Sequence, residues 1–205
     1  MKIHTSIDYQ MNKTFHTFLY LCLCFTLSVN GQAKNEIEVR IDKKEFPKLA
    51  QDLILSLPNN IKRLKLYKET DGNENSYEAK FKLNRKHYSV EFSENGLIED
   101  IEITIKFSAI EPTKKTNIKN YFKNSYSKHE VIKTQEQYVH DKSSNSKVFL
   151  DAVLRQNTYV LPNFEIIAEV KQNKKRTIRE FTFNATGSLI YFRILDNTSY
   201  EHVLY

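Results

Sequence analysis

The chain has few of the residues on which many kinds of functional site depend. Its 205 residues include two cysteines, four glycines, four prolines and no tryptophan. Both cysteines, Cys22 and Cys24, lie in an apolar N-terminal stretch, so a chain without that stretch forms no disulfide and has no catalytic thiolate. The later glycines, Gly72, Gly96 and Gly187, stand singly in predicted turns, which excludes a glycine-rich phosphate loop.

No group of side chains has the spacing of a metal or catalytic site. Four histidines outside the N-terminal stretch lack a cysteine or a paired carboxylate at ligand spacing. They are His87, His129, His140 and His202. Ser144 and Ser146 lie in a polar stretch without the strand–turn–helix context of a nucleophile. We therefore expect a protein that is not an enzyme and that uses no metal and no cofactor.

The charge of the chain is mixed rather than one-sided. Its 31 Lys and Arg residues accompany 25 Asp and Glu residues, which gives a formal net charge of +6. Such a mixture is typical of a solvated surface, so a nucleic-acid partner is not expected. Hydrophobic residues make up 40% of the chain, and this content is enough for a core in one ordinary domain or two small ones.

The N-terminus has the pattern of an export signal. Lys13 precedes an apolar run, and the small residues Val29 and Gly31 follow it in the pattern of a cleavage site. Residues 1–31 are therefore predicted to be a signal peptide, and cleavage would leave Gln32 as the new N-terminus. The predicted location is exported, either periplasmic or secreted.

Three alternatives concern this N-terminal stretch. Met11 is a second candidate for the true start, because residues 1–10 add no useful basic region. Cleavage after Ala33 is the alternative to cleavage after Gly31. A retained N-terminal anchor is the third alternative, but the run is short for a spanning helix, so no transmembrane segment is expected after cleavage.

Three antiparallel strands are predicted between Tyr77 and Phe107. Apolar and polar residues alternate there with a period of two, which places one face on a core and one charged face toward water. The apolar positions are Tyr77, Ala79, Phe81, Leu83, Tyr88, Val90, Phe92, Ile101, Ile103, Ile105 and Phe107. Residues 84–86 and 93–96 supply the turns, and Gly96 can take a positive φ at no steric cost.

The charged face of this sheet is the predicted binding surface. Its residues are Glu78, Lys80, Lys82, Glu91, Glu102 and Lys106. A surface that carries both signs suits recognition of a protein better than binding of a polyanion, because its acids would repel phosphates. The same alternation also stabilises a sheet through cross-strand pairs, so each single residue has a structural explanation as well.

One irregularity is predicted at the start of the third strand. Counting back by twos from Ile101 places Glu99 on the apolar face and Ile98 on the polar face. An unpaired charge buried there would be costly. We expect either a bulge near Glu99 and Asp100, which would return Ile98 to the core, or a strand that begins only at Ile101.

Helices are predicted on both sides of the three strands. The first has a stripe of apolar residues at helical spacing, namely Phe46, Leu49, Ala50, Leu53, Ile54 and Leu57. The second spans residues 112–126 and carries Lys114, Lys115, Lys119 and Lys123 outside a buried side of Ile118, Tyr121, Phe122 and Tyr126. We expect one core to contain Leu53, Phe81, Val90, Phe92 and Ile103. Residues 148–154 fit a short helix and a strand equally.

The other strands complete a pattern that occurs twice. Strands are predicted at residues 61–69, with Leu64 and Leu66 inward, at 129–139 and within 164–195. In both halves an aromatic residue, Phe92 or Phe183, stands four residues before a turn glycine. The fold class is therefore predicted as α+β, with two repeats of a helix packed on an antiparallel β-meander. The first would span residues 32–139, with the following helix and strand; the second, degraded and incomplete, would span 140–205 with the C-terminal tail.

The pattern resembles the PepSY-like family of secreted bacterial proteins, which is related in shape to the beta-lactamase-inhibitor fold. The resemblance is carried by residues 77–81, 88–92 and 95–98, the helix from Pro112 and the segment 181–190. It implies two repeats of helix on antiparallel sheet behind a signal peptide in a Gram-negative envelope. It also implies a role in inhibition or protein binding.

Taken together, these features predict a secreted or periplasmic, non-enzymatic binding module, in the manner of an inhibitor-like protein-binding domain. The expected partner is a protein, which the sequence does not identify. The alternative is an envelope-associated protein that binds a polyanion through its lysine-rich helix.

Overall fold

The computed structural model describes residues 33–34, 36–72 and 74–195. The predicted signal peptide, its cleavage site before Gln32 and the end of the C-terminal tail lie outside the described residues. Among the helices that are described, none combines the length and the apolar character that a membrane crossing requires.

The described strands form one ten-stranded sheet in the order β1-β10-β9-β8-β7-β6-β5-β4-β3-β2. They are β1 (Ala33–Lys34), β2 (Glu36–Arg40), β3 (Lys62–Asp71), β4 (Glu74–Leu83), β5 (Lys86–Ser93), β6 (Ile98–Thr104), β7 (Lys128–Val139), β8 (Asn163–Gln172), β9 (Lys175–Phe183) and β10 (Leu189–Leu195). Neighbours are antiparallel, except that β1 pairs with β10 in parallel. The predicted α+β class with an antiparallel sheet is confirmed.

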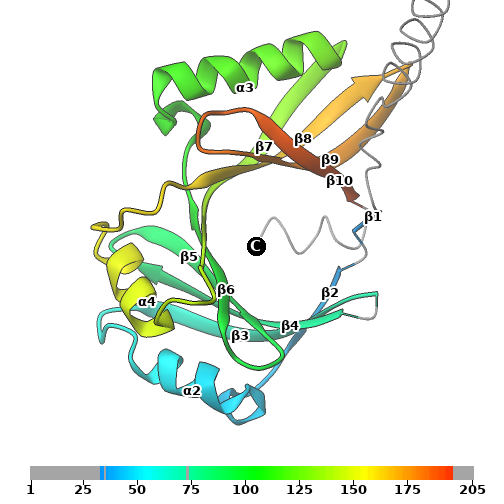
Figure 1. Ribbon diagram of the computed structural model, residues 1–205. Helices are drawn as coiled ribbons and strands as arrows, with labels where there is room; N and C mark the ends of the chain where they lie inside the picture. Colours follow the sequence, from blue (N-terminus) through cyan, green and yellow to red (C-terminus); the bar gives the residue numbers. More distant parts are fainter. Residues whose placement is uncertain (1–32, 35, 73, 196–205) are drawn as a thin grey trace, which may run out of the picture. The chain divides into compact units, whose positions relative to one another are not determined.

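In the described part of the chain, three α-helices and two 3-10 turns connect the strands (Figure 1). They are η1 (Lys43–Glu45), α2 (Lys48–Leu55), η2 (Phe107–Ala109), α3 (Pro112–Ser125) and α4 (Ser146–Leu154). The ambiguous residues 148–154 are helical in α4, whose first turn is capped by the Asn145 side chain through Lys147 N and Val148 N. In sequence, α2 precedes β3–β6 and α3 precedes β7–β10, and the division into two repeats stays a prediction.

Helices cover one face of the sheet and create two apolar clusters on it. The first cluster packs α2 and α4 on the strands from β3 to β6, and the second packs α3 mainly on β8 and β9. Phe81, Val90, Phe92 and Ile103 belong to the first cluster and Leu53 packs against it, so the predicted shared core is confirmed. The partly buried side chain of Ile105 packs against both clusters.

The predicted phase of the central strands is confirmed, including its irregularity. Val90 is 1% exposed and Ile101 is fully buried. The pairing of β5 with β6 shifts between Glu91 and Phe92, which leaves Glu99 as the extra residue of a bulge. Because the bulge restores the phase, Ile98 is fully buried on the core side, as expected.

Three details of the predicted elements are wrong. Leu49 is 53% exposed, because the buried side of α2 is centred on Ala50 and Ile54 and Leu49 lies beside it in the first turn. Leu64 is also exposed, since Arg63 has a φ of 57° and the pairing of β3 with β4 is irregular there. The third central strand ends at Thr104 rather than at residue 107, where η2 redirects the chain toward α3.

Candidate functional site

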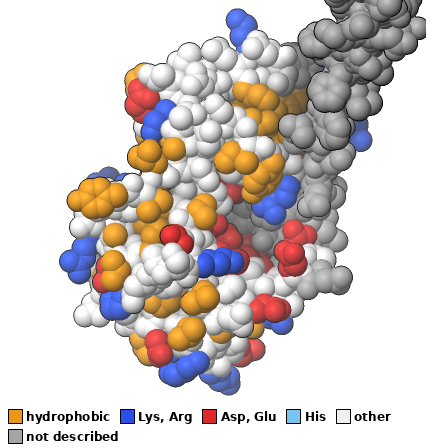
Figure 2. Space-filling model, viewed as in Figure 1, with side chains coloured by type: hydrophobic (Ala, Val, Ile, Leu, Met, Phe, Trp, Pro, Cys, Tyr) orange, Lys and Arg blue, Asp and Glu red, His pale blue; other side chains and the backbone are white. Residues whose placement is uncertain are grey.

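The polar face of the sheet lines a cavity of about 640 Å³. Among the described residues, its walls come from strands β2 to β10 and carry twelve acidic and three basic residues. The acids are Glu38, Glu69, Asp71, Glu74, Glu78, Glu91, Glu94, Glu99, Asp100, Glu102, Glu165 and Glu180, and the bases are Lys80, Lys133 and Arg193. Figure 2 shows acidic side chains gathered where this side of the molecule is hollowed. The acidic cavity thus contrasts with a chain whose net charge is +6.

Strand register brings acidic side chains directly opposite one another. Glu78 of β4 pairs with Glu91 of β5, and Glu91 pairs with Asp100 of β6. Like charges opposite one another destabilise a sheet, so this arrangement is not explained by sheet stability. An electrostatic cost concentrated in a cavity is a frequent property of binding and catalytic sites.

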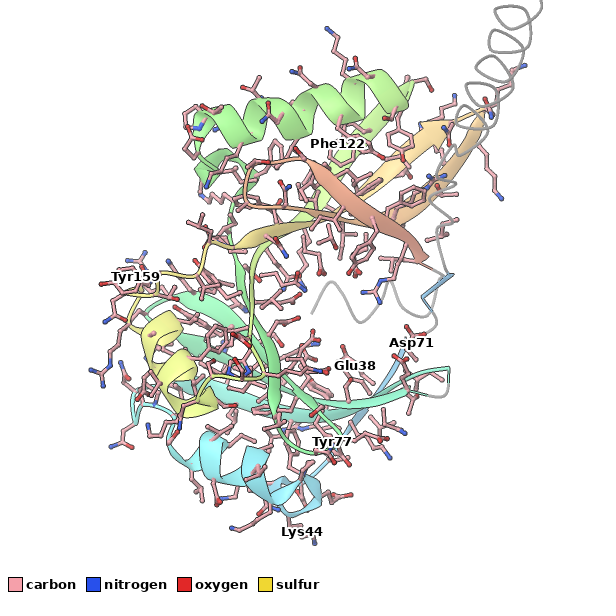
Figure 3. The ribbon with its side chains drawn as sticks, in the orientation of Figure 1. Glu38, Lys44, Asp71, Tyr77, Phe122 and Tyr159 are labelled. Atoms are coloured by element: carbon pink, nitrogen blue, oxygen red, sulfur yellow. The ribbon has the colours of Figure 1, made fainter. Side chains whose placement is uncertain are left out.

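The second half of the sheet contributes to the same cavity. Glu165 of β8 and Glu180 of β9 line it, and Arg193 of β10 donates from Nε to Glu180 Oε1 at 3.0 Å. Arg193 Nη1 also lies 3.9 Å from Asp71 Oδ2 of β3, although these strands are far apart in the sheet order. The sheet therefore curls around the cavity, and Asp71 and Glu38 point into this space (Figure 3).

Lys80 is the internal counter-charge of one group of acids. Its Nζ lies 2.7 Å from Glu38 Oε1 and 2.8 Å from Glu78 Oε2, and Ser89 Oγ donates to the other oxygen of Glu78. Burial raises the pKa of Glu78, but the Lys80 charge and these hydrogen bonds outweigh it, so the pKa lies below its usual value. Burial alone would lower the pKa of Lys80, yet the Glu78 and Glu38 charges raise it. This group is charged and internally compensated.

A second group of acids has the opposite electrostatic character. The negative charge of Asp100 and then burial raise the pKa of Glu91 well above its usual range. Burial and the Glu165 charge raise the pKa of Asp100 to about 7, against the hydrogen bond that Gln137 Nε2 donates to its Oδ2 at 3.0 Å. Burial and the Asp100 charge raise the pKa of Glu102 to about 7. The described residues thus compensate these carboxyls poorly, which favours their protonated forms.

Four of the six predicted binding residues meet in the cavity. Glu78, Lys80, Glu91 and Glu102 all line it, whereas Lys82 lies in a smaller neighbouring cavity of about 310 Å³ and Lys106 is exposed beyond the end of β6. The expectation that this charged face is open to water is wrong for Glu78 and Glu102, which are 4% and 7% exposed. The reason is the curl of the sheet, which covers the face that the helices leave uncovered. The binding role of the six residues stays a prediction.

The sequence interpretation missed most of the acids that complete the cavity. Glu38, Glu69, Glu165 and Glu180 each occupy one position of an alternating strand and look like ordinary solvated charges. Their common feature is that all lie on the sheet face opposite the apolar residues. A count of the charged residues on that face across all the strands, rather than across the central three, would have shown that acids are in excess there.

One serine–histidine contact lies beside α4. His140 is buried, its Nδ1 lies 3.1 Å from Ile98 O, and its Nε2 lies 3.0 Å from Ser144 Oγ. Ser144 Oγ also lies 2.8 Å from Asp141 O within its own turn. These contacts attach the turn before α4 to β6, which is a structural function.

The alternative polyanion site on α3 is not supported by the contacts of the described residues. Lys115 Nζ donates to Ser108 O at 2.9 Å, and Lys114 Nζ lies 5.7 Å from the centre of the Phe164 ring. These lysines thus contact the protein itself, as long side chains over an apolar core commonly do.

The raised pKa values predict that stability falls as the pH rises. The pKa values of Asp100 and Glu102 are about 7 in the folded state and about 4 in the unfolded chain. Between these values the folded chain binds more protons, so the free energy of unfolding decreases with pH and the loss is complete only above the folded pKa. We expect a lower melting temperature at about pH 8 than at about pH 5, measured with EDTA present to remove metal ions. The difference should be roughly 2–4 °C for each kcal/mol by which the free energy of unfolding decreases.

Scanning calorimetry at constant ionic strength would measure this profile. Glu78 has the opposite sign, but its lowered pKa confines its effect to the range below its unfolded value near about 4.5. A melting temperature that rises from about pH 5 to about pH 8 would contradict the raised pKa values of Asp100 and Glu102.

Comparison with solved structures finds chains that align with most of this one at low sequence identity. A DUF2874 family protein from Bacteroides ovatus is 12% identical, with a TM-score of 0.48 over 73% of this chain and 87% of that chain. A BLIP-like protein from Bacteroides fragilis is 16% identical, with a TM-score of 0.45 over 73% of this chain and 86% of that chain. A proposed calcium-regulated periplasmic protein from Bacteroides thetaiotaomicron is 20% identical, with a TM-score of 0.31 over 78% and 97%.

No protein-family model and no curated protein matches the chain. The resemblance to the PepSY-like family therefore stays a prediction. At these identities and TM-scores the three solved structures say nothing about function. The chain is similar to BLIP-like and DUF2874 family proteins in its arrangement of sheet and helices, and only in that.

Proposed function

We propose that the protein is a non-catalytic binding protein that holds a positively charged segment of another protein in its acidic cavity. The observation that carries the proposal is the excess of twelve acids over three bases among the described residues that line the cavity. A lysine- or arginine-rich segment supplies the missing positive charge, and carboxylates pair well with both side chains. This revises the sequence prediction, which expected a protein partner on an open surface of both signs.

The size and the rim of the cavity support a ligand of this kind. A volume of about 640 Å³ lies within the range of ligand sites in proteins. The exposed acids Glu74 and Glu94 stand at its edge, where they can attract a basic chain before it docks. Deeper in the cavity, a cationic side chain beside Glu91 and its neighbours would favour the ionised form of these carboxyls.

The finer sequence predictions belong to the same proposal. Export to the periplasm or the medium, and membership of the PepSY-like family, would place the partner in a Gram-negative envelope. An origin in two repeats would explain why Gly96 and Gly187, in corresponding turns, pack against α2 and α3 respectively. The cavity would then be built from the polar faces of both repeats.

The test is a binding measurement with a labelled lysine-rich peptide in EDTA. We expect saturable binding that weakens with salt, and no binding of a glutamate-rich peptide of equal length. The double substitution Glu74→Lys and Glu94→Lys should weaken binding by about tenfold or more, because each change replaces an attraction by a repulsion. Both residues are exposed, so the fold should be retained.

The matched control makes the same change in net charge at two positions outside the cavity. Asp52→Lys with Glu130→Lys changes the net charge equally on exposed positions of α2 and β7, and should leave the affinity nearly unchanged. If both double variants lose affinity for the peptide equally, the effect depends on net charge alone, and the cavity is not the binding site. Turnover of a substrate by the purified protein would contradict the non-catalytic part.

A further inference from the structure

Two groups of three carboxylates lie in the cavity, and their geometry is alike. One consists of Glu38, Glu69 and Glu78, and the other of Glu91, Asp100 and Glu102. In each group, one carboxylate oxygen from every residue lies within 4.8 Å of the others. Two ligands on opposite sides of a calcium ion, each about 2.4 Å from it, are separated by the same distance.

The two groups differ in their cationic partner. Lys80 Nζ lies within 2.8 Å of carboxylate oxygens of Glu38 and Glu78, so the first group already contains a positive charge. The second group has no comparable partner among the described residues, where no Lys or Arg nitrogen lies within 4.0 Å of its oxygens. Lys133 acts on Glu102 only from a greater distance.

Asp100 provides a second and independent observation. This residue is 9% exposed, it lines the cavity, and its Oδ1 has no hydrogen-bond partner within the described part of the chain. Its position is fixed from two sides, because the bulge at Glu99 sets its backbone and Gln137 Nε2 donates to its Oδ2. A buried acceptor atom without a donor costs free energy unless a ligand satisfies it.

We propose that Glu91, Asp100 and Glu102 form a site for a hard divalent cation of the calcium type. All the ligand atoms are carboxylate oxygens, which suit calcium or magnesium and not the softer metals that prefer nitrogen and sulfur. Three carboxylates offer up to four oxygens that accept no hydrogen bond from Gln135 or Gln137, and water from the open cavity completes the six to eight ligands of calcium. Magnesium is a poorer match, because it demands regular octahedral geometry and releases its water reluctantly.

Gln135 and Gln137 of β7 are the positioning residues of this site. Gln135 Nε2 donates to Glu102 Oε2, and Gln137 Nε2 donates to Asp100 Oδ2. Each amide occupies one oxygen of its carboxylate and leaves the other for the ion. The raised pKa values of the three carboxyls agree with this arrangement, and an arriving cation should release protons from them.

The proposal is independent of any protein partner, and calorimetric titration with the metal alone tests it. The purified chain, stripped of metal with EDTA and exchanged into buffer near about pH 8, is titrated with calcium, magnesium and zinc salts. We expect one calcium per chain, magnesium at least about tenfold weaker, and a calcium-dependent rise in melting temperature. Zinc should produce no comparable site.

Substitutions separate this site from general attraction to acids. Asp100→Asn keeps the side-chain shape and removes a charge, so it should fold as well as the natural chain in EDTA and weaken calcium at least about tenfold. Glu91→Gln is a second variant with the same expected loss. Asp52→Asn on exposed α2 is the matched control and should leave calcium affinity unchanged.

Absence of calcium binding, or equal affinity in Asp100→Asn and the natural chain, would overturn the proposal. Since these titrations contain no peptide and the peptide assay contains no metal, either proposal can fail without the other.

Discussion

Replacing Lys80 by methionine should lower the free energy of unfolding by about 3–5 kcal/mol, the range for removing one partner of a buried ion pair. The side chains of Lys80, Glu38 and Glu78 are 23%, 9% and 6% exposed, so the carboxylates would remain in the cavity without their cation. Urea denaturation at about pH 7 measures the change as a lower midpoint at constant slope.

Two further variants show whether the loss arises from unpaired charge. Lys82→Met on the same strand should cost roughly 0.5 kcal/mol or less, because Lys82 stands opposite Lys62 and His87 rather than an acid. Adding Glu78→Gln to Lys80→Met should recover part of the loss, since it removes the charge of the buried carboxylate that lies 2.8 Å from Lys80 Nζ in the natural chain. A Lys80→Met variant as stable as Lys82→Met would contradict the role assigned to Lys80.

This expectation differs from the one drawn from sequence, in which Lys80 and Glu91 belong to a charged face turned toward water. Alternation with a period of two identifies the two faces of a strand but not what lies over each face. Around Phe81 and Val90 it correctly located the core face. It could not show that the opposite face lines a cavity, because that depends on the curl of a ten-stranded sheet.

Local chemistry explains which elements were predictable. A conflict between charge and phase predicted either a bulge near Glu99 or a strand that begins at Ile101, and the structure has the bulge. The helix from Pro112 followed from its apolar spacing. Residues 148–154 were ambiguous because a short apolar run fits a helix and a strand equally, and tertiary packing decides between them. Phe149 and Val153 of α4 pack into the first apolar cluster, which selects the helix.

The candidate site was the least predictable part of the molecule. Its acids come from strands β2 to β6, from the turn after β5 and from β8 and β9, and in the sequence each is one charged residue among many. Their convergence needs contacts such as that of Arg193 with Asp71, which are separated by most of the chain. A net charge of +6 also concealed the site, because the acids gather on one face while the bases spread elsewhere.

The two apolar clusters raise the question of whether the sheet unfolds in one step. Hydrogen bonding between β6 and β7 joins the strands beneath them, and Ile105 packs against both clusters. The cavity on the other face also needs both halves of the sheet. These connections favour one cooperative transition over the separate melting of two halves.

Truncating Phe122 or Phe92 to alanine should each cost about 3–5 kcal/mol, the range for buried Phe-to-Ala changes. Phe122 is fully buried between α3 and the sheet (Figure 3). Its ring lies edge-on to the ring of Phe181, and the two ring centroids are 4.9 Å apart. Phe92 is 1% exposed in the other cluster, where Phe46 packs against it. Because the sheet is continuous, both variants should shift the same single transition in calorimetry.

The control on α3 is Lys123→Ala, an exposed position next to Phe122 that should change stability by roughly 0.5 kcal/mol or less. If Phe122→Ala instead splits the melting curve, so that only one of two transitions moves, the halves unfold independently. The acidic cavity would then be lost in the first of those transitions, because its walls come from both halves. Binding of the lysine-rich peptide, followed across the same temperature range, would detect that loss directly.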